Sequence, residues 1–207
     1  MTVAHVPAAQ WGMRLLRSVS EDDMVAAFLA AEATSERYGP QIRQILARLG
    51  QPHHLVSDPD PRDEDANAAR RQVLAAYRDY PAGDVFTGMP ADVSWHRAML
   101  TPAEVRTVRY IDYPYWTDFS GGTRLAADGA RRLGPWPDQP AGSIYRQVAE
   151  NARDGRLPPP IIVIGEPGPA NLVVIEGHKR LTGLLLCPQW LPAELEVVLG
   201  IVSHHDK

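Results

Sequence analysis

Four polar residues and one glycine separate two apolar segments of the sequence. The run "NLVVI" ends at residue 175, "EGHKR" follows at 176–180, and apolar residues resume at Leu181. If a strand leads through Gly177 directly into a helix, the first backbone N–H groups of that helix have no partner inside it, and the positive end of the helix dipole favours an anion. Positive side chains in the same turn add to this preference. The pattern predicts a phosphate-binding site formed by Gly177, His178, Lys179, Arg180 and Thr182.

The cations of this segment allow a second interpretation. Lys179 and Arg180 could solvate the start of a helix or pair with acids nearby, and neither role needs a ligand. The local sequence does not decide between the two. Arg124 in "SGGTRLA" leaves a similar choice. The glycine pair before it would let its guanidinium reach a pocket as a substrate-binding group, whereas a structural ion pair fits equally well.

Three carboxylates could take up a proton if a phosphoryl group were transferred at this site. Such a transfer needs cations on the phosphates, a metal ion, and a carboxylate that accepts the proton of the attacking hydroxyl. Glu176 lies beside the predicted phosphate site, and Asp112 and Asp118 lie upstream. A base next to the phosphates would suffer like-charge repulsion. We therefore expect Asp112 to be the catalytic base and Glu176 to be a supporting or metal-binding residue; other metal ligands stay unassigned.

The second half of the sequence must supply the elements that position these groups. "VRYIDY" predicts a strand at 108–113, "PPPIIVIG" and "NLVVIEG" predict two short buried strands, and "LPAELEVVLGIV" predicts a turn followed by a last strand. "GSIYRQVAENARDG" predicts a helix with a serine cap and a glycine at its end. This order favours a small mixed sheet with helices between its strands.

The first half is predicted to be mainly helical. "SEDDMVAAFLAAEATSERYG" begins with Ser20, followed three residues later by Asp23 in a capping pattern. "PQIRQILARLG" and "ANAARRQVLAAYRDY" indicate two further helices, with the acidic loop "DPDPRDED" between them. We expect an α+β protein in which a helical N-terminal half, residues 1–105, packs on a small mixed-sheet domain, residues 106–207.

The composition is that of an ordinary globular protein. Of 207 residues, 44% are hydrophobic and 22% are charged, which allows one large domain or two small ones. The formal net charge of -4 argues against a protein that coats nucleic acid. Cys187 is the single cysteine, so we expect no internal disulfide, a packed thiol and a reducing compartment. Without a signal-peptide pattern or an apolar run that could span a bilayer, a cytoplasmic protein with no membrane contact is expected.

The segment "GRLPPPIIVIGEPGPANLVVIEGHKRLTGLLL" at 155–186 resembles the core of the ParB/sulfiredoxin superfamily. In that superfamily a strand leads into a glycine–polar–polar–arginine box that opens a helix and binds nucleotide phosphates, and 177–180 corresponds to this box. The resemblance covers about residues 106–203. It implies ATP or CTP as the nucleotide, with Mg²⁺ as the candidate metal, and it implies that the segment around Asp112 borders the nucleotide.

Two departures from the superfamily narrow the expected function. His178 stands where sulfiredoxin has its cysteine, and Cys187 lies too far along the helix to replace it. Sulfinic-acid reduction is therefore not expected. No helix-turn-helix domain follows the resembled region, so ParB-type clamping on DNA is not expected, and nucleic acid is an unlikely partner.

Two functions from different classes follow from the resemblance. The first is an enzyme that transfers a phosphoryl group to a small metabolite or nucleotide, or hydrolyses a phosphate bond in one. The second is a non-catalytic module that responds to nucleotide binding, and a ParB-like nuclease is a further alternative. The expected partners are a nucleotide and a small-molecule substrate. The sequence does not identify the nucleotide base, the acceptor substrate or the role of the helical half. It also leaves the oligomeric state open, and a homodimer is one possibility.

Overall fold

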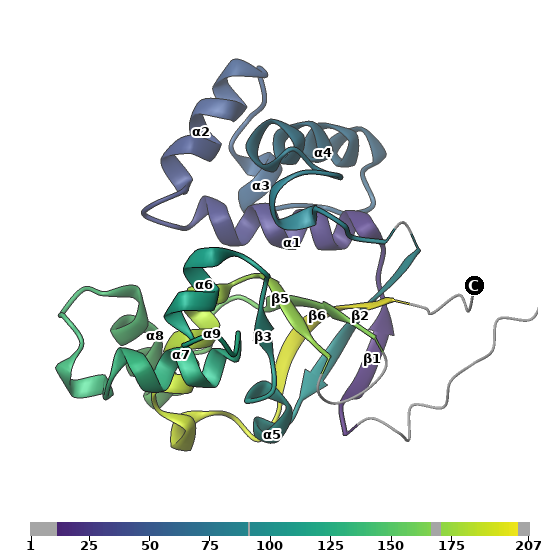
Figure 1. Cartoon of the computed structure of the whole chain (residues 1–207). Coiled ribbons are helices and arrows are strands. Elements are labelled where there is room, and N and C mark those ends of the chain that lie inside the picture. The colour runs from purple at the N-terminus through teal and green to yellow at the C-terminus, as the bar shows by residue number, and fades with distance from the viewer. Residues whose placement is uncertain (1–11, 91, 167–170, 203–207) are drawn as a thin grey trace, which may run out of the picture. The chain divides into compact units, whose positions relative to one another are not determined.

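Figure 1 shows the computed structural model of the chain, in which residues 12–90, 92–166 and 171–202 are described. The chain divides into two compact units. The helical unit comprises residues 19–95, and the sheet unit combines the chain up to residue 18 with the chain from residue 96 onward. Helices together with a six-stranded mixed sheet confirm the predicted α+β class. The expected packing of a helical half against the sheet stays a prediction.

Polar side chains cap the two longest helices of the helical unit. Ser20 Oγ accepts a hydrogen bond from the backbone N–H of Asp23, and the Asp23 carboxylate accepts one from the Ser20 N–H, so the predicted capping box is present. Asp63 caps a later helix by accepting from the Ala66 N–H. The elements of this unit are α1 (Glu21–Ala33), α2 (Gly39–Arg48), α3 (His54–Ser57), α4 (Glu64–Arg78) and the 3-10 turn η2 (Asp84–Phe86).

The helical unit has its own apolar core. Phe86 of η2 packs its ring 5.5 Å from the ring of Phe28 and 4.9 Å from that of Tyr80, measured between centroids. Edge-on and tilted arrangements of this kind are favourable for aromatic rings. The helices contribute the remaining buried side chains, which include Met24, Leu29, Ile42, Leu46, Val56, Val73 and Leu74.

One buried cation holds the loop between α3 and α4. Arg70 of α4 is only 1% exposed. Its Nη1 donates to the Leu55 carbonyl at 3.3 Å and its Nη2 to the Asp60 carbonyl at 2.6 Å, and Nη2 also donates to the Asn67 side chain. Burial lowers the pKa of this guanidinium, although nearby carboxylates oppose the effect. The predicted acidic loop at 58–65 is therefore anchored from inside by an arginine.

The six strands of the sheet lie in the order β1-β2-β6-β4-β5-β3. β1 is antiparallel to β2 and β4 is antiparallel to β5, whereas β4 and β6 are parallel and so are β3 and β5. The strands are β1 (Arg14–Ser18), β2 (Val93–Leu100), β3 (Arg109–Tyr110), β4 (Ile161–Gly165), β5 (Val173–Glu176) and β6 (Leu195–Val202). The predicted strands of the second half are all present, although β3 is shorter than the predicted 108–113.

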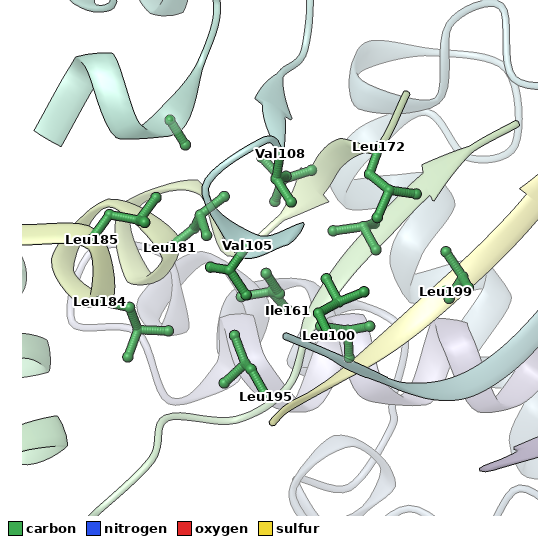
Figure 2. Packing of buried hydrophobic residues seen from close by; sticks show 14 of the residues in the cluster. Leu100, Val105, Val108, Ile161, Leu172, Leu181, Leu184, Leu185, Leu195 and Leu199 are labelled. Carbon is green, nitrogen blue, oxygen red and sulfur yellow. The ribbon is translucent and has the colours of Figure 1, made fainter. Parts of the chain in front are cut away.

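α7 and α8 pack against α9, whose apolar residues join those of the strands in one core (Figure 2). Gly183 of α9 allows the close approach of α8, because a Cβ at this position would lie 2.7 Å from Val148 Cβ. The helices of the sheet unit are α5 (Pro102–Val105), α6 (Pro114–Phe119), α7 (Ala126–Leu133), α8 (Ile144–Arg153) and α9 (His178–Leu186), with 3-10 turns η3 (Trp136–Asp138) and η4 (Pro188–Trp190).

The structure differs from the sequence-based prediction within residues 1–105. The prediction made this part helical, but β1 and β2 lie in it and pair with each other at one side of the sheet. The hydrophobic pattern of β2 explains part of the difference. Its buried residues Trp95, Ala98 and Leu100 do not alternate strictly with exposed ones, so the period-two signal of a strand is weak. The prediction also left out α6 and α7.

Candidate functional site

The strand–glycine–helix junction predicted from the sequence is present. β5 ends at Glu176, Gly177 follows with φ 92° and ψ 22°, and α9 begins at His178. This backbone conformation favours glycine. A Cβ on Gly177 would also lie 2.6 Å from Ile161 Cγ2, so the turn is sterically closed to side chains. No side chain caps α9, and its first turn contains no acid, which leaves the positive end of the helix without a protein anion in that turn.

Two strand ends meet at this junction. β3 runs parallel to β5, with Arg109 opposite Val173 and Tyr110 opposite Val174. The carboxyl ends of both strands therefore lie at the same edge of the sheet, where ligands commonly bind in parallel sheets. The chain leaves β3 toward Asp112 at the edge where it leaves β5 toward Gly177. The structure thus brings two of the predicted site segments together.

A stack of three rings joins the segment after β3 to the start of α9. The Trp116 ring of α6 lies 4.6 Å from the Tyr110 ring and 5.0 Å from the His178 ring, at interplanar angles of 27° and 15°. Trp116 is half-buried against the core of the sheet unit. The stack places α6 beside the N-terminus of α9. Sequence reasoning missed the contact of Trp116 with the predicted phosphate site, although the aromatic run "YIDYPYWTDF" at 110–119 was available as a signal.

Thr182 lies below the surface of the site. Its side chain is fully buried, and its hydroxyl donates to the His178 carbonyl at 2.8 Å and lies 2.6 Å from the Tyr110 hydroxyl. Burial raises the pKa of Tyr110 to about 12, while the hydrogen bond with Thr182 opposes the shift. Thr182 therefore positions the first turn of α9 from beneath, and its hydroxyl is already engaged inside the protein.

Arg180 forms an ion pair with Glu176, four residues before it. Its Nη2 donates to Glu176 Oε2, and its Nη1 donates to the Pro159 carbonyl at 2.8 Å. The Arg180 and Glu176 side chains are 13% and 7% exposed. The structure therefore realises the second interpretation for Arg180, in which it pairs with a nearby acid. Lys179, in the same turn, is half-buried.

Arg124 and Asp112 interact at the end of β3. Arg124 donates from Nε and Nη2 to the Tyr110 carbonyl at 3.1 Å and 2.9 Å, and its Nη1 lies 3.4 Å from Asp112 Oδ2. Its backbone N–H donates to Ser120 Oγ at 2.8 Å. These contacts give Arg124 a structural role, which was one of its two predicted roles. The Asp112 side chain remains 82% exposed and is open to solvent.

Two further predicted residues lie elsewhere in the sheet unit. Asp118 is exposed and lines a shallow cavity of about 480 Å³ with Phe119, Arg132 and Leu133. Cys187 follows α9 and is 5% exposed, and burial raises the pKa of its thiol. A buried thiol with a raised pKa has little thiolate character. Cys187 is thus the packed cysteine that the sequence predicted.

Two kinds of feature are absent from the residues that the structure describes. Within 12–90, 92–166 and 171–202, no three His, Cys, Asp or Glu side chains gather into a group that could hold a metal ion. No helix in these ranges combines the length and apolar character needed to cross a membrane.

A scan against protein-family models found no match for this sequence. Searches of curated proteins and of solved structures found no match either. The resemblance to the ParB/sulfiredoxin superfamily therefore stays a prediction, which rests on the residues quoted for it.

Proposed function

We propose that this chain binds ATP or CTP through the nucleotide's phosphates at 177–180, in the manner of the ParB/sulfiredoxin superfamily, and acts in phosphoryl transfer or phosphate-bond hydrolysis. The observation that carries the proposal is the junction at Gly177. It is a helix start without a side-chain cap, at the shared carboxyl edge of two parallel strands. Backbone N–H groups and a helix dipole in this position are complementary to a phosphate group.

In the proposed complex, the residues of the junction divide into three roles. The first turn of α9 would receive the phosphates, with Lys179 supplying charge. Arg180 would contribute mainly by its position, since Glu176 and the Pro159 carbonyl already orient its guanidinium. Asp112 would accept the proton of the attacking hydroxyl, which requires access from solvent, and its carboxylate is largely exposed.

Mg²⁺ is the expected metal for such a reaction. It commonly binds nucleotide phosphates with only one or two protein carboxylates and retains several waters. A site of three or more protein ligands is therefore not a requirement for it. In the proposed complex the phosphates and water would hold most of the metal's coordination positions, because Asp112 is assigned to the proton transfer and Glu176 is paired with Arg180.

Nucleotide binding without chemistry is the second candidate function. Both candidate carboxylates are already paired with arginines, Glu176 with Arg180 and Asp112 with Arg124. A carboxylate that already binds a guanidinium must release or share it before it can bind the attacking hydroxyl. Under this alternative, nucleotide binding would change the conformation of α6 and of the start of α9. The stacked rings of Trp116 and His178 join these two segments.

Calorimetry with ATP and CTP in the presence of Mg²⁺ tests the binding step. Lys179→Gln removes one charge from the first turn of α9 and should weaken binding at least about tenfold, equivalent to about 1.4 kcal/mol. Arg48→Gln, at an exposed position on α2, removes the same charge elsewhere and should leave affinity unchanged. Equal affinities of wild type and Lys179→Gln would rule out this location, and no binding of either nucleotide by wild type would rule out the proposal.

Turnover measurements separate the enzyme from the binding module. Asp112→Asn keeps the size of the side chain and removes the proton acceptor, so it should lower nucleotide turnover by about 100-fold or more while nucleotide affinity changes little. Asp118→Asn, an exposed acid on the same segment, is the matched control and should keep full turnover. If wild type binds nucleotide but shows no turnover with a panel of hydroxylated metabolites, the binding module is the correct function.

A further inference from the structure

A second candidate site lies near the opposite end of α9 from Gly177. The C-terminal part of α9, η4, α7 and the residue after α5 enclose a groove of about 350 Å³. Its floor is apolar, and Ala127, Ala130, Leu185, Leu186 and Pro188 contribute to it. Figure 2 shows Leu185 at this end of α9. The volume is at the lower end of the range for small-molecule sites.

Two arginines line this otherwise apolar groove. Arg106 is exposed, and its side chain makes no hydrogen bond or ion pair with another residue of the described ranges. Arg131 is 77% exposed and has one partner, Asp128, at 2.7 Å on the same helix. An exposed pair of this kind contributes little stability and leaves the other donors of the guanidinium available. The groove therefore combines an apolar surface with two accessible cations.

Arg106 carries the charge that favours an anion at the groove. The charge of Arg131 is balanced by Asp128, although its remaining donors stay available, whereas Arg106 has no acid partner among the described residues. The partial negative charges at the ends of α7 and α9 fall off within the last turn of each helix. A guanidinium also fits the geometry of a carboxylate, to which it can donate two parallel hydrogen bonds.

We infer that this groove binds a small amphiphilic carboxylate, such as a medium-chain alkanoate. The alkyl chain would lie on the apolar floor, where burial of its methylene groups is favourable. The carboxylate would take its hydrogen bonds from Arg106 and Arg131. This inference does not depend on nucleotide binding at Gly177, since α9 has nine residues and spans about 12 Å at 1.5 Å per residue.

Titration calorimetry of the full chain with octanoate tests this inference. Octanoate should bind, whereas acetate, which lacks the chain, and octylammonium, which has the opposite charge, should show no binding. The requirement for both the chain and the negative charge distinguishes this groove from a general anion site or a general apolar surface. Equal binding of octanoate and octylammonium, or none of octanoate, would overturn the inference.

Two variants locate the binding. Arg106→Gln should weaken octanoate binding at least about tenfold, and Ala127→Phe should abolish it by filling the groove. Arg132→Gln is the matched control, because Arg132 is the neighbour of Arg131 but lines the cavity beside Asp118. Unchanged octanoate affinity in Arg106→Gln would place the ligand elsewhere. If the groove bound the free C-terminal carboxylate of an apolar peptide but no octanoate, the inference would be overturned, and the ligand would be a protein partner.

Discussion

Both units of this chain bury charged or polar groups, but they use them differently. In the helical unit, Arg70 is enclosed by backbone carbonyls and one amide, and the result is a closed loop. In the sheet unit, the Glu176–Arg180 pair and the Tyr110–Thr182 hydrogen bond lie on either side of an uncapped helix start. Buried polar groups thus fasten a loop in one unit and fix the geometry around the proposed phosphate-binding turn in the other.

The largest expected effect tests the role of Arg70. Arg70→Met retains much of the apolar stem but removes every donor, so the Leu55 and Asp60 carbonyls and the Asn67 amide oxygen lose their bonds. We expect a loss of about 3 kcal/mol in the free energy of unfolding of the helical unit. Urea denaturation followed by circular dichroism measures it.

The control for Arg70 is its neighbour on α4. Arg71 forms an exposed ion pair with Asp22, and Arg71→Met should cost less than about 1 kcal/mol. A stable Arg70→Met variant would show that the loop closes without the buried cation. The proposed difference between the two units would then not hold, because the buried arginine would not be what fastens the loop.

Two glycine-to-alanine substitutions, at Gly177 and at Gly155, test the junction in the sheet unit. Gly177→Ala introduces strain at a positive φ and a clash with Ile161, so we expect a loss of about 2–3 kcal/mol in unfolding free energy. Gly155 has φ 75°, and a Cβ added there would meet no atom within 4 Å, so Gly155→Ala should show the strain alone, about 1 kcal/mol. If Gly177→Ala and Gly155→Ala lost equal amounts of unfolding free energy in thermal or urea denaturation, the Ile161 side chain would be able to move away from the added methyl group at no cost.

The hydrogen bond beneath the junction should have a smaller effect. Tyr110→Phe removes the phenol from Thr182, whose hydroxyl still bonds the His178 carbonyl, and we expect a loss of about 1 kcal/mol. Tyr115 on α6 is 51% exposed, and Tyr115→Phe should change stability by less than about 0.5 kcal/mol. A difference between the two variants in urea denaturation supports a fixed junction; its absence argues against one.

The same phenol gives the sheet unit an alkaline limit. The pKa of Tyr110 is raised to about 12 in the folded protein, against an ordinary value near 10 in the unfolded chain. The unfolded state therefore loses its proton first, and the stability that the neutral phenol contributes is fully present below pH 10 and is lost between about pH 10 and 12. Absorbance titration near 295 nm should show a phenolate that forms near pH 12 in wild type and is missing in Tyr110→Phe, while Tyr77 of the helical unit, whose pKa burial raises further, ionises later. Loss of that phenolate in Tyr115→Phe instead would reassign it.

The sequence predicted those parts of the fold whose cause is local. The cap at Ser20 and the helix start at Ser143 each depend on residues within one turn, and both are present. The junction at Gly177 is also local, since a strand, a glycine and a helix follow one another directly. The sequence could therefore predict this junction. It also gave the pairing of Arg180 with a nearby acid as one of two interpretations.

Other features depend on residues that are distant in the sequence. The Tyr110–Thr182 hydrogen bond and the Trp116–His178 stack join segments more than sixty residues apart, and no spacing rule brings them together. Thr182 was assigned to the ligand, but the tertiary fold buries it. Sheet membership of β1 is also non-local: "RLLRS" has no alternation of polar and apolar residues and becomes a strand by pairing with β2.

The pairing of β1 with β2 has a consequence for how this chain can be cut and rejoined. Ser18 and His96 are opposite each other in that pairing, and within the helical unit the Val19 N–H donates to the Trp95 carbonyl at 3.0 Å. The whole helical unit thus occupies the place of a hairpin loop. A two-residue Asn-Gly turn between residues 18 and 96 has the geometry to close the two strands as an ordinary hairpin. Conversely, the adjoining ends of the excised segment suit it for grafting into the hairpin of another protein.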